Sequence, residues 1–212
     1  QVDDVIKKSK NLYGYVGVFP EEVKDFSQKT LYDMENIIKN NDKIIGIGEI
    51  GLDYYWDKSF KDLQKEVFIK QIEFANEMNL PINIHSRDAH FDTLDILKKY
   101  NKNSMAIMHC FSGSIEFAKE CIKEGIYISL GGVVTFKNAK TAKEVAKEIP
   151  LEFLLLETDD PYLTPVPFRG KENQPSYVKY VAQEIANLRG ITFEEVANAT
   201  TSNAKNIFPR IM

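Results

Sequence analysis

Four side chains of the types that bind divalent metals are spread along the sequence, each beside a short apolar run. They are Glu49, His85, His109 and Asp159, at or just past the end of four different runs. Two imidazoles and two carboxylates in one pocket suit zinc or manganese, and the carboxylates also suit magnesium. Such ions lower the pKa of a bound water and clamp the oxygens of a phosphoryl or carbonyl group. The pattern therefore predicts metal-assisted hydrolysis, with Asp159 accepting the proton of the water.

The segments around these residues predict the elements that must position them. Short, nearly continuous apolar runs rich in β-branched residues are typical of parallel strands covered on both faces, and segments of helical periodicity lie between them. Strand and helix therefore alternate, as in an α/β fold with a parallel sheet. We expect strands over 13–18, 43–49, 81–85, 105–109, 126–130 and 153–157, and helices over 2–10, 33–40, 60–79, 88–100, 115–124, 139–148, 175–188, 192–199 and 202–208.

The placement of the polar residues distinguishes a barrel from a doubly wound sheet. A dinucleotide-binding sheet carries a glycine-rich loop after its first strand, whereas Gly46, Gly48 and Gly51 lie within and just after a strand. In a (β/α)8 barrel the chemistry instead collects at the carboxyl ends of many strands, as it does here. We therefore predict an α/β fold of the TIM-barrel type, as found in metal-dependent hydrolases.

Strand parity indicates that the four candidate ligands converge. Side chains alternate between the two faces of a strand, so Glu49 shares the face of Ile47, and the other three ligands take equivalent positions. All four can then point into one barrel mouth. Glu157 lies one layer deeper on the face of Asp159 and is expected to orient a ligating histidine. A single histidine or carboxylate at a strand end is more often structural, so the prediction depends on the four together.

Composition narrows the classes of function. The chain has 212 residues, 27% charged and 43% hydrophobic, which is typical of one globular domain, here 1–212. Its net charge of −4 means that a nucleic-acid substrate would have to be held locally. No apolar run approaches the roughly 20 residues of a membrane span and no secretory signal opens the chain. We expect a cytoplasmic monomer without membrane contact, with Cys110 and Cys121 as reduced thiols.

Five stretches carry motifs that together resemble one protein family. They are 47–55 (IGEIGLDYY), 84–89 (IHSRDA), 109–113 (HCFSG), 156–159 (LETD) followed by 161–163 (PYL), and 169–173 (RGKEN). In this order they closely resemble the TatD family of metal-dependent deoxyribonucleases over nearly the whole chain. The resemblance implies a TIM barrel with a two-metal site that hydrolyses DNA phosphodiesters, typically as a 3′-to-5′ exonuclease on single strands.

The resemblance also implies a role for each ligand. Glu49 is similar to the carboxylate that bridges both metals, and His85 and His109 are similar to ligands of one of them. Asp159 is similar to a ligand of the other metal and to the proton acceptor. The cofactors implied are one or two divalent ions of magnesium, manganese or zinc.

The sequence departs from the family pattern at three places. The His-x-His pair on the first barrel strand is absent, and so are two of eight strands, which roughly 40 to 50 upstream residues would supply. We therefore expect an N-terminally incomplete barrel with little or no nuclease activity, prone to self-association through its open edges. Phe19 stands where the family usually has histidine. Asp160 replaces a small residue and is expected to raise the pKa of its neighbour or to attract a cation.

Basic and aromatic side chains near the strand ends are candidates for holding DNA. Basic side chains there meet phosphate oxygens, and aromatic rings stack on unpaired bases. The alternatives are ordinary solvated cations and rings that act as packing lids. The candidate phosphate contacts are Arg87, Arg169, Lys137 and Lys171; the candidate stacking rings are Tyr54, Tyr55, Trp56 and Phe136; Phe111 and Tyr162 are assigned to packing.

Two other functions compete with DNA hydrolysis. A related metal hydrolase could act on an ester or amide, including D-aminoacyl-tRNA, since fold does not fix substrate. Relatives of that kind often use a bridging lysine, and the carboxylate of Glu49 at this place favours the nuclease. The third candidate is an inactive fragment that binds metal, nucleic acid or a partner without catalysis.

Overall fold

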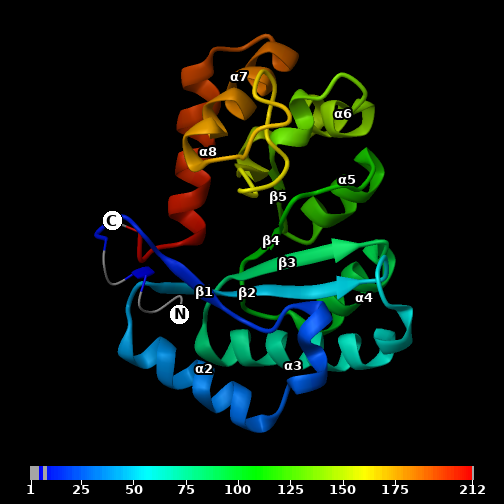
Figure 1. Ribbon diagram of the computed structural model, residues 1–212, viewed down its shortest axis with the longest axis vertical. Coiled ribbons are helices and arrows are strands. Elements are labelled where there is room, and N and C mark those ends of the chain that lie inside the picture. Colours follow the sequence, from blue (N-terminus) through cyan, green and yellow to red (C-terminus); the bar gives the residue numbers. More distant parts are fainter. Residues whose placement is uncertain (1–4, 7–8, 212) are drawn as a thin grey trace. The chain divides into compact units, whose positions relative to one another are not determined.

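The computed structural model describes residues 5–6 and 9–211 of the chain. They form two compact units, one of Gln1–Ile107 with Ile207–Met212 and one of Met108–Asn206. Strands and helices alternate in both units (Figure 1). The single domain over 1–212 that the composition indicates stays a prediction.

The first unit is a parallel sheet covered by helices. Its strands lie in chain order and are all parallel. The backbone N–H of Ile82 donates to the carbonyl of Met105 at 2.8 Å, where the chain enters the fourth strand. The elements are β1 (Gly14–Val16), η1 (Pro20–Asp25), α2 (Gln28–Asn40), β2 (Ile44–Asp53), η2 (Lys58–Phe60), α3 (Lys61–Met78), β3 (Ile82–Arg87), α4 (His90–Tyr100) and the start of β4 (Ala106–Met108).

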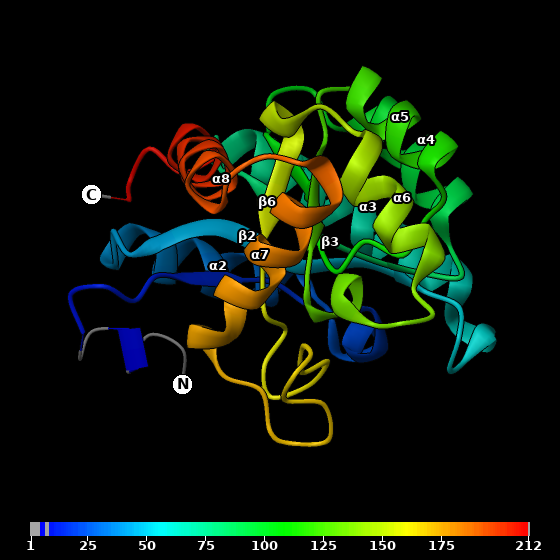
Figure 2. The ribbon, with the colours of Figure 1, turned by 90° about the horizontal axis from the view of Figure 1, so that it is seen from above.

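The second unit continues the same alternation. Strands β5 and β6 are parallel, with Ile128 opposite Leu154 and Leu130 opposite Leu156. Helix α7 lies beside β6 (Figure 2). The elements are α5 (Ile115–Lys123), β5 (Tyr127–Leu130), η3 (Gly132–Thr135), α6 (Lys140–Glu148), η4 (Leu151–Phe153), β6 (Leu154–Leu156), η5 (Pro175–Tyr177), α7 (Val178–Arg189) and α8 (Phe193–Ile207).

Two buried glutamines on α3 fix the carboxyl ends of β1 and β2. The side-chain amide of Gln71 accepts from the backbone N–H of Val18 at 2.7 Å and donates to its carbonyl at 3.1 Å. Gln64 makes the same pair of hydrogen bonds with the backbone of Asp53, at 2.9 and 3.0 Å. Both glutamines are nearly inaccessible to solvent, so these hydrogen bonds face no competition from water.

Strand β2 contains a bulge and continues beyond its expected end. Ile47 pairs with Ile82, but Ile50 pairs with Ile84, so β2 has one residue more than β3 over this stretch. Gly51 then has a φ of 143° and passes so close to β3 that a Cβ would lie 2.0 Å from the carbonyl oxygen of His85. Only glycine fits there, and the strand runs on to residue 53.

The helices agree with the sequence analysis except at two places. Helix α2 starts at Gln28 rather than at 33, because Ser27 and Thr30 form a capping box. The two helices expected at 192–199 and 202–208 are a single helix, so that prediction is wrong. The hydroxyl of Thr200 donates to the carbonyl of Val196 at 2.9 Å, which satisfies this polar group inside the helix. The helix expected over 2–10 lies largely outside the described residues. Within this range the structure describes 5, 6, 9 and 10, of which 5 and 6 are helical.

The structure bears on two expectations from composition, the state of the cysteines and the lack of a membrane span. Within the described residues, neither Cys110 nor Cys121 takes part in a disulfide. Within the described ranges, no helix has both the length and the apolar character needed to cross a bilayer. The expected monomer and cytoplasmic location stay predictions.

Candidate functional site

The four candidate ligands do not all lie at strand ends. His109 directly follows β4, and Asp159 follows β6 within three residues. Glu49 and His85 instead lie inside β2 and β3, so their expected position at the ends of these strands is wrong. Both strands continue past these residues, and β2 pairs with β3 as far as Asp53 opposite Arg87.

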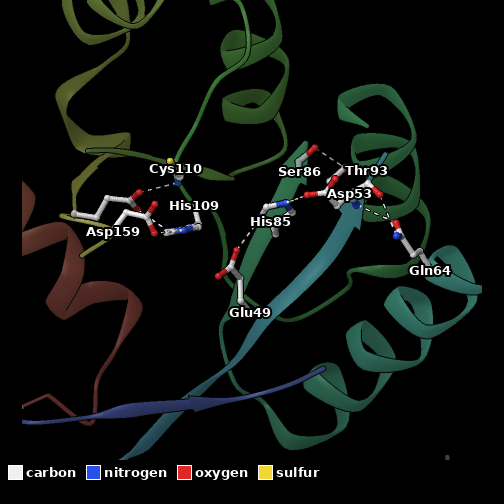
Figure 3. A network of polar contacts seen from close by, with 10 residues as sticks. Glu49, Asp53, Gln64, His85, Ser86, Thr93, His109, Cys110 and Asp159 are labelled. Atoms are coloured by element: carbon white, nitrogen blue, oxygen red, sulfur yellow. Dashed lines mark hydrogen bonds and ion pairs between the residues drawn. The ribbon is translucent and has the colours of Figure 1, made fainter. Parts of the chain in front are cut away.

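In the first unit, the imidazole of His85 lies between two carboxylates (Figure 3). Its Nδ1 is 2.9 Å from Oε1 of Glu49, and its Nε2 is 2.9 Å from Oδ2 of Asp53. The side chain of Asp53 is 2% exposed, whereas that of Glu49 is 30% exposed. One ring nitrogen therefore faces a buried carboxylate and the other faces an accessible one.

The surroundings of Asp53 indicate which nitrogen carries the proton. Oδ1 of Asp53 accepts from the backbone N–H of Tyr55 at 2.8 Å, and the backbone of Asp53 is bound by Gln64. An ionised carboxylate only accepts, so each ring nitrogen can donate to the carboxylate that it faces, and a metal held by Nδ1 and Glu49 would leave the proton on Nε2 as the donor to Oδ2. In the neutral ring, Nδ1 then keeps a lone pair directed at the side of Glu49, which is the form that binds a metal.

The same contacts set the pKa of His85. Burial of the ring disfavours the charged form. The hydrogen bonds and negative charges of Glu49 and Asp53 outweigh burial and raise the pKa above its usual 6.5. The carboxylates around this histidine therefore stabilise positive charge at the ring.

In the second unit, His109 also lies between two carboxylates. Its Nδ1 is 2.9 Å from Oε2 of Glu157, and its Nε2 is 3.5 Å from Oδ1 of Asp159. Glu157 also accepts from the backbone N–H of Cys110 at 2.9 Å and from the hydroxyl of Ser129 at 2.5 Å. With so many donors, Glu157 is held as the acceptor, so Nδ1 of His109 carries the proton and Nε2 presents its lone pair toward Asp159.

These pairs fit a divalent metal by their donor types and spacing. Over the part of the chain that the structure describes, no group of three or more His, Cys, Asp and Glu residues is arranged to hold an ion. The structure instead shows the pairs Glu49–His85 and His109–Asp159, with donor atoms 2.9 and 3.5 Å apart. Two ligands at metal distances of about 2.0 to 2.2 Å lie roughly 3 to 3.5 Å from each other. The convergence of all four ligands on one barrel mouth stays a prediction.

Two residues of these networks escaped the sequence analysis. Asp53 and Ser129 are buried polar residues in the mainly apolar strands β2 and β5. Each contacts the site, Asp53 through His85 and Ser129 through Glu157. The signal that could have found them is a polar residue directly beside apolar strand residues, since a buried polar group must have a partner.

The candidate phosphate contacts are all exposed, and three of them lie over aromatic rings. The guanidinium carbon of Arg87 is 3.8 Å from the ring centroid of Tyr55, and that of Arg169 is 3.6 Å from the ring centroid of Phe136. Nζ of Lys171 is 5.6 Å from the ring of Phe168. Lys137 is exposed at the loop that follows η3.

The aromatic candidates divide by burial. Tyr55 and Trp56 are exposed, but Tyr54 is only 5% exposed and donates its hydroxyl to Asp92 at 2.8 Å, so its expected stacking on a base is wrong. Phe111 is buried against Phe117, which confirms its packing role. Tyr162 is 72% exposed, so its assignment to packing is wrong.

The two unusual residues have defined contacts. The ring of Phe19 packs edge-on against the ring of His85, with centroids 4.8 Å apart. Phe19 therefore shields one side of a candidate ligand. Asp160 is exposed and accepts a hydrogen bond from the hydroxyl of Thr158 at 2.6 Å. Its expected effects on a neighbouring pKa and on cations stay predictions.

Comparisons with known proteins find one protein family over nearly the whole chain. The family model described as TatD related DNase matches residues 1–209. The chain is 53% identical over 206 residues to "Uncharacterized metal-dependent hydrolase YabD" of Bacillus subtilis (strain 168), covering 97% of the chain and 80% of that relative. It is 40% identical over 208 residues to "Uncharacterized metal-dependent hydrolase YcfH" of Escherichia coli (strain K12), covering 97% and 77%.

Solved structures agree on the fold. The crystal structure of YJJV, a TatD homolog from Escherichia coli k12, matches with a TM-score of 0.92 and 29% identity over 98% of this chain and 81% of that one. A TatD family hydrolase from Entamoeba histolytica matches in fold, with a TM-score of 0.85 and 24% identity over 97% and 79% of the two chains. The fold is thus a parallel α/β fold of the TIM-barrel type, as predicted, and the described residues contain six strands of it.

Proposed function

Because the chain belongs to the TatD-related DNase family and is a metal-dependent hydrolase of that family, we propose that it hydrolyses DNA phosphodiester bonds. The proposed reaction is 3′-to-5′ exonucleolytic cleavage of single strands. The observation that carries it is the pair of imidazoles that each face an accessible carboxylate while a second carboxylate fixes the opposite ring nitrogen. Metal-ligating histidines are typically held in this way.

The proposed ligands are Glu49, His85, His109 and Asp159. Magnesium, manganese or zinc bound there supplies a water of lowered pKa and a Lewis acid for phosphoryl oxygens. Asp53 and Glu157 keep each imidazole in the tautomer that presents its lone pair to the accessible carboxylate. We assign to Asp159 the acceptance of the proton of the attacking water, and to Glu49 the second catalytic carboxylate.

The substrate is proposed to be held by local positive charge. The chain carries a net charge of −4, so attraction of DNA depends on individual cations. Arg87, Arg169, Lys137 and Lys171 are exposed and offer N–H donors for phosphate oxygens. Arginine is the best suited, since its planar fork can bind a phosphate through two hydrogen bonds.

The test is end-resolved cleavage of labelled DNA. The chain is freed of metal with EDTA, and a 5′-labelled single-stranded oligonucleotide is then added with magnesium, manganese or zinc. We expect a weak ladder of products shortened from the 3′ end in the presence of metal, since the family's His-x-His pair is absent from the sequence, and no cleavage in EDTA. The variants His109→Ala and Asp159→Asn should lose the activity, whereas Asp95→Asn, an exposed carboxylate on α4, should keep it.

Three outcomes would overturn the proposal. One is the absence of DNA cleavage with every metal while D-aminoacyl-tRNA or another ester is hydrolysed. A second is binding of metal without hydrolysis of any of these substrates. The third is full DNA cleavage by the variants His109→Ala and Asp159→Asn, because the proposed ligands would then be irrelevant to the reaction.

A further inference from the structure

An exposed cluster of Tyr55, Trp56 and Arg87, termed the Arg87 platform, lies at the carboxyl ends of β2 and β3. The guanidinium carbon of Arg87 is 3.8 Å from the ring centroid of Tyr55 and 5.4 Å from that of Trp56. The two aromatic rings are nearly perpendicular, at 87°, with centroids 4.8 Å apart. Tyr55 is 50% exposed and Trp56 is 65% exposed, so the chain places a large aromatic surface in water.

The backbone beneath the platform is fixed on both sides. The N–H of Tyr54 donates to the carbonyl of Arg87 at 2.9 Å, and the N–H of Tyr55 donates to Oδ1 of Asp53 at 2.8 Å. The buried hydroxyl of Tyr54 is bound to Asp92 on α4. A surface that is already ordered loses little conformational entropy when a ligand binds. The platform therefore has the preorganisation of a binding site.

Arg87 has hydrogen-bonding capacity that the protein does not use. Among the described residues, the interactions found for its guanidinium are those with the two aromatic rings, and no carboxylate is paired with it. Stacking uses the face of the guanidinium, whereas its N–H groups point outward in the plane and remain able to donate. The platform thus offers an aromatic surface and a fork of donors side by side. This combination suits one unpaired base and the adjacent phosphate.

We propose that the Arg87 platform binds one unpaired nucleotide of single-stranded DNA, with the base stacked on Trp56 and the phosphate held by Arg87. This inference rests on the proposed function. It assigns to the platform the preference of the protein for single strands. A base within a duplex has both faces covered by its neighbours, so it cannot stack on Trp56. The platform is tied to the candidate ligand His85 through Asp53, because one oxygen of this carboxylate binds Tyr55 and the other binds His85.

Trp56 is the only tryptophan of the chain, so its fluorescence reports on the platform directly. We expect saturable quenching when the metal-free chain in EDTA is titrated with a short thymidine oligonucleotide. An abasic strand with the same phosphates and a blunt duplex should each bind at least about tenfold more weakly, since base stacking contributes roughly 5- to 150-fold in affinity. Equal quenching by the abasic strand would overturn the proposal.

Variants that keep the reporter test the two neighbours of Trp56. Arg87→Ala should weaken binding roughly 10- to 150-fold through the loss of charged hydrogen bonds to phosphate, and Tyr55→Ala roughly 2- to 5-fold because the ring under the guanidinium is lost. Arg87→Lys should lie between Arg87→Ala and the wild type, because it keeps the charge without the planar fork. The matched control is Tyr32→Ala, which removes a tyrosine that is 62% exposed on α2 and should bind as the wild type does. Wild-type binding by Tyr55→Ala and Arg87→Lys would refute the platform.

The titration tests the platform and the cleavage assay tests the proposed function, so either proposal can be overturned without the other. Binding is measured in EDTA, where no metal-dependent hydrolysis occurs. Quenching that depends on Arg87 without any DNA cleavage would overturn the proposed function and leave the platform as a single-strand binding site. DNA cleavage without quenching would overturn the platform and leave the proposed function.

Discussion

Nε2 of His85 and Oδ2 of Asp53 lie 2.9 Å apart in a place where the carboxylate is 2% exposed. This buried contact determines which nitrogen of the ring remains for a metal. The other ring nitrogen faces Glu49, whose side chain is 30% exposed. The orientation of a candidate metal ligand thus depends on a residue that itself has no access to a metal.

Asp53→Asn should weaken metal binding while leaving every proposed ligand in place. The amide has no charge to fix the proton on Nε2 of His85, so the ring loses its preferred tautomer. Loss of such a partner typically reduces metal affinity about 10- to 100-fold. Competition with a chromophoric chelator measures the affinity, and nitrogen-15 spectra of the histidine ring report the tautomer independently. Asp95→Asn on α4 is the control, and equal affinities in the two variants would show that Asp53 does not orient His85.

Glu157→Gln should destabilise the metal-free chain. Glu157 accepts hydrogen bonds from His109, Cys110 and Ser129, and the amide would direct a donor at one of these donors. An unsatisfied buried group costs roughly 1 to 3 kcal/mol. Urea unfolding measures the loss. Glu144→Gln on the exposed face of α6 should change the free energy of unfolding by less than about 0.5 kcal/mol, and a similar value for both variants would contradict the prediction.

Gly51→Ala should cost more stability than Gly125→Ala. Both glycines have positive φ, 143° and 73°, but nothing lies within 4 Å of a Cβ at Gly125. Gly125→Ala therefore measures backbone strain alone, about 1 to 2 kcal/mol. At Gly51 the added Cβ also meets the carbonyl oxygen of His85 at 2.0 Å, and overpacking adds about 1 to 3 kcal/mol. Urea unfolding of the two variants under the same conditions gives the difference, and equal losses would mean that β2 relaxes away from β3.

Acid should destabilise the wild type more than the variant His90→Gln. Burial lowers the pKa of His90 below 6.5, and the charge of Asp88 opposes this only in part. Below pH 6.5, His90 is protonated in the unfolded chain but stays neutral in the folded chain until the pH reaches its lower folded pKa. The titration of His90 therefore has no effect on stability well above that pH and lowers stability as pH falls toward the folded pKa. The difference in urea-unfolding free energy between wild type and His90→Gln should thus change in favour of the variant on acidification, and a constant difference would contradict the lowered pKa.

Much of the fold follows from the sequence because apolar runs and helical periodicity are local signals. Every expected strand in the described residues is present, and His109 lies where the end of its run places it. The bulge in β2 could not be predicted, because it depends on how residues 47–50 pair with β3. The position of Glu49 inside the strand follows from that pairing.

The aromatic run 54–56 shows a second limit of local signals. Three adjacent aromatic residues look alike in sequence, yet Tyr54 is buried and its two successors are exposed. Contact with Asp92 on α4, which is distant along the chain, makes the difference. The importance of Asp53 was hidden in the same way, since the proximity of its carboxylate to His85 depends on the register of two strands.

Helix α3 supplies Gln64 and Gln71 as amide partners for the backbone at Asp53 and Val18. Each side-chain amide offers one donor and one acceptor, as an adjacent strand would, so the helix holds the ends of two strands in place. The segments that follow these strand ends are therefore not needed to fix the strands. Exposed side chains in those segments can then be exchanged while His85 and its carboxylates keep their positions.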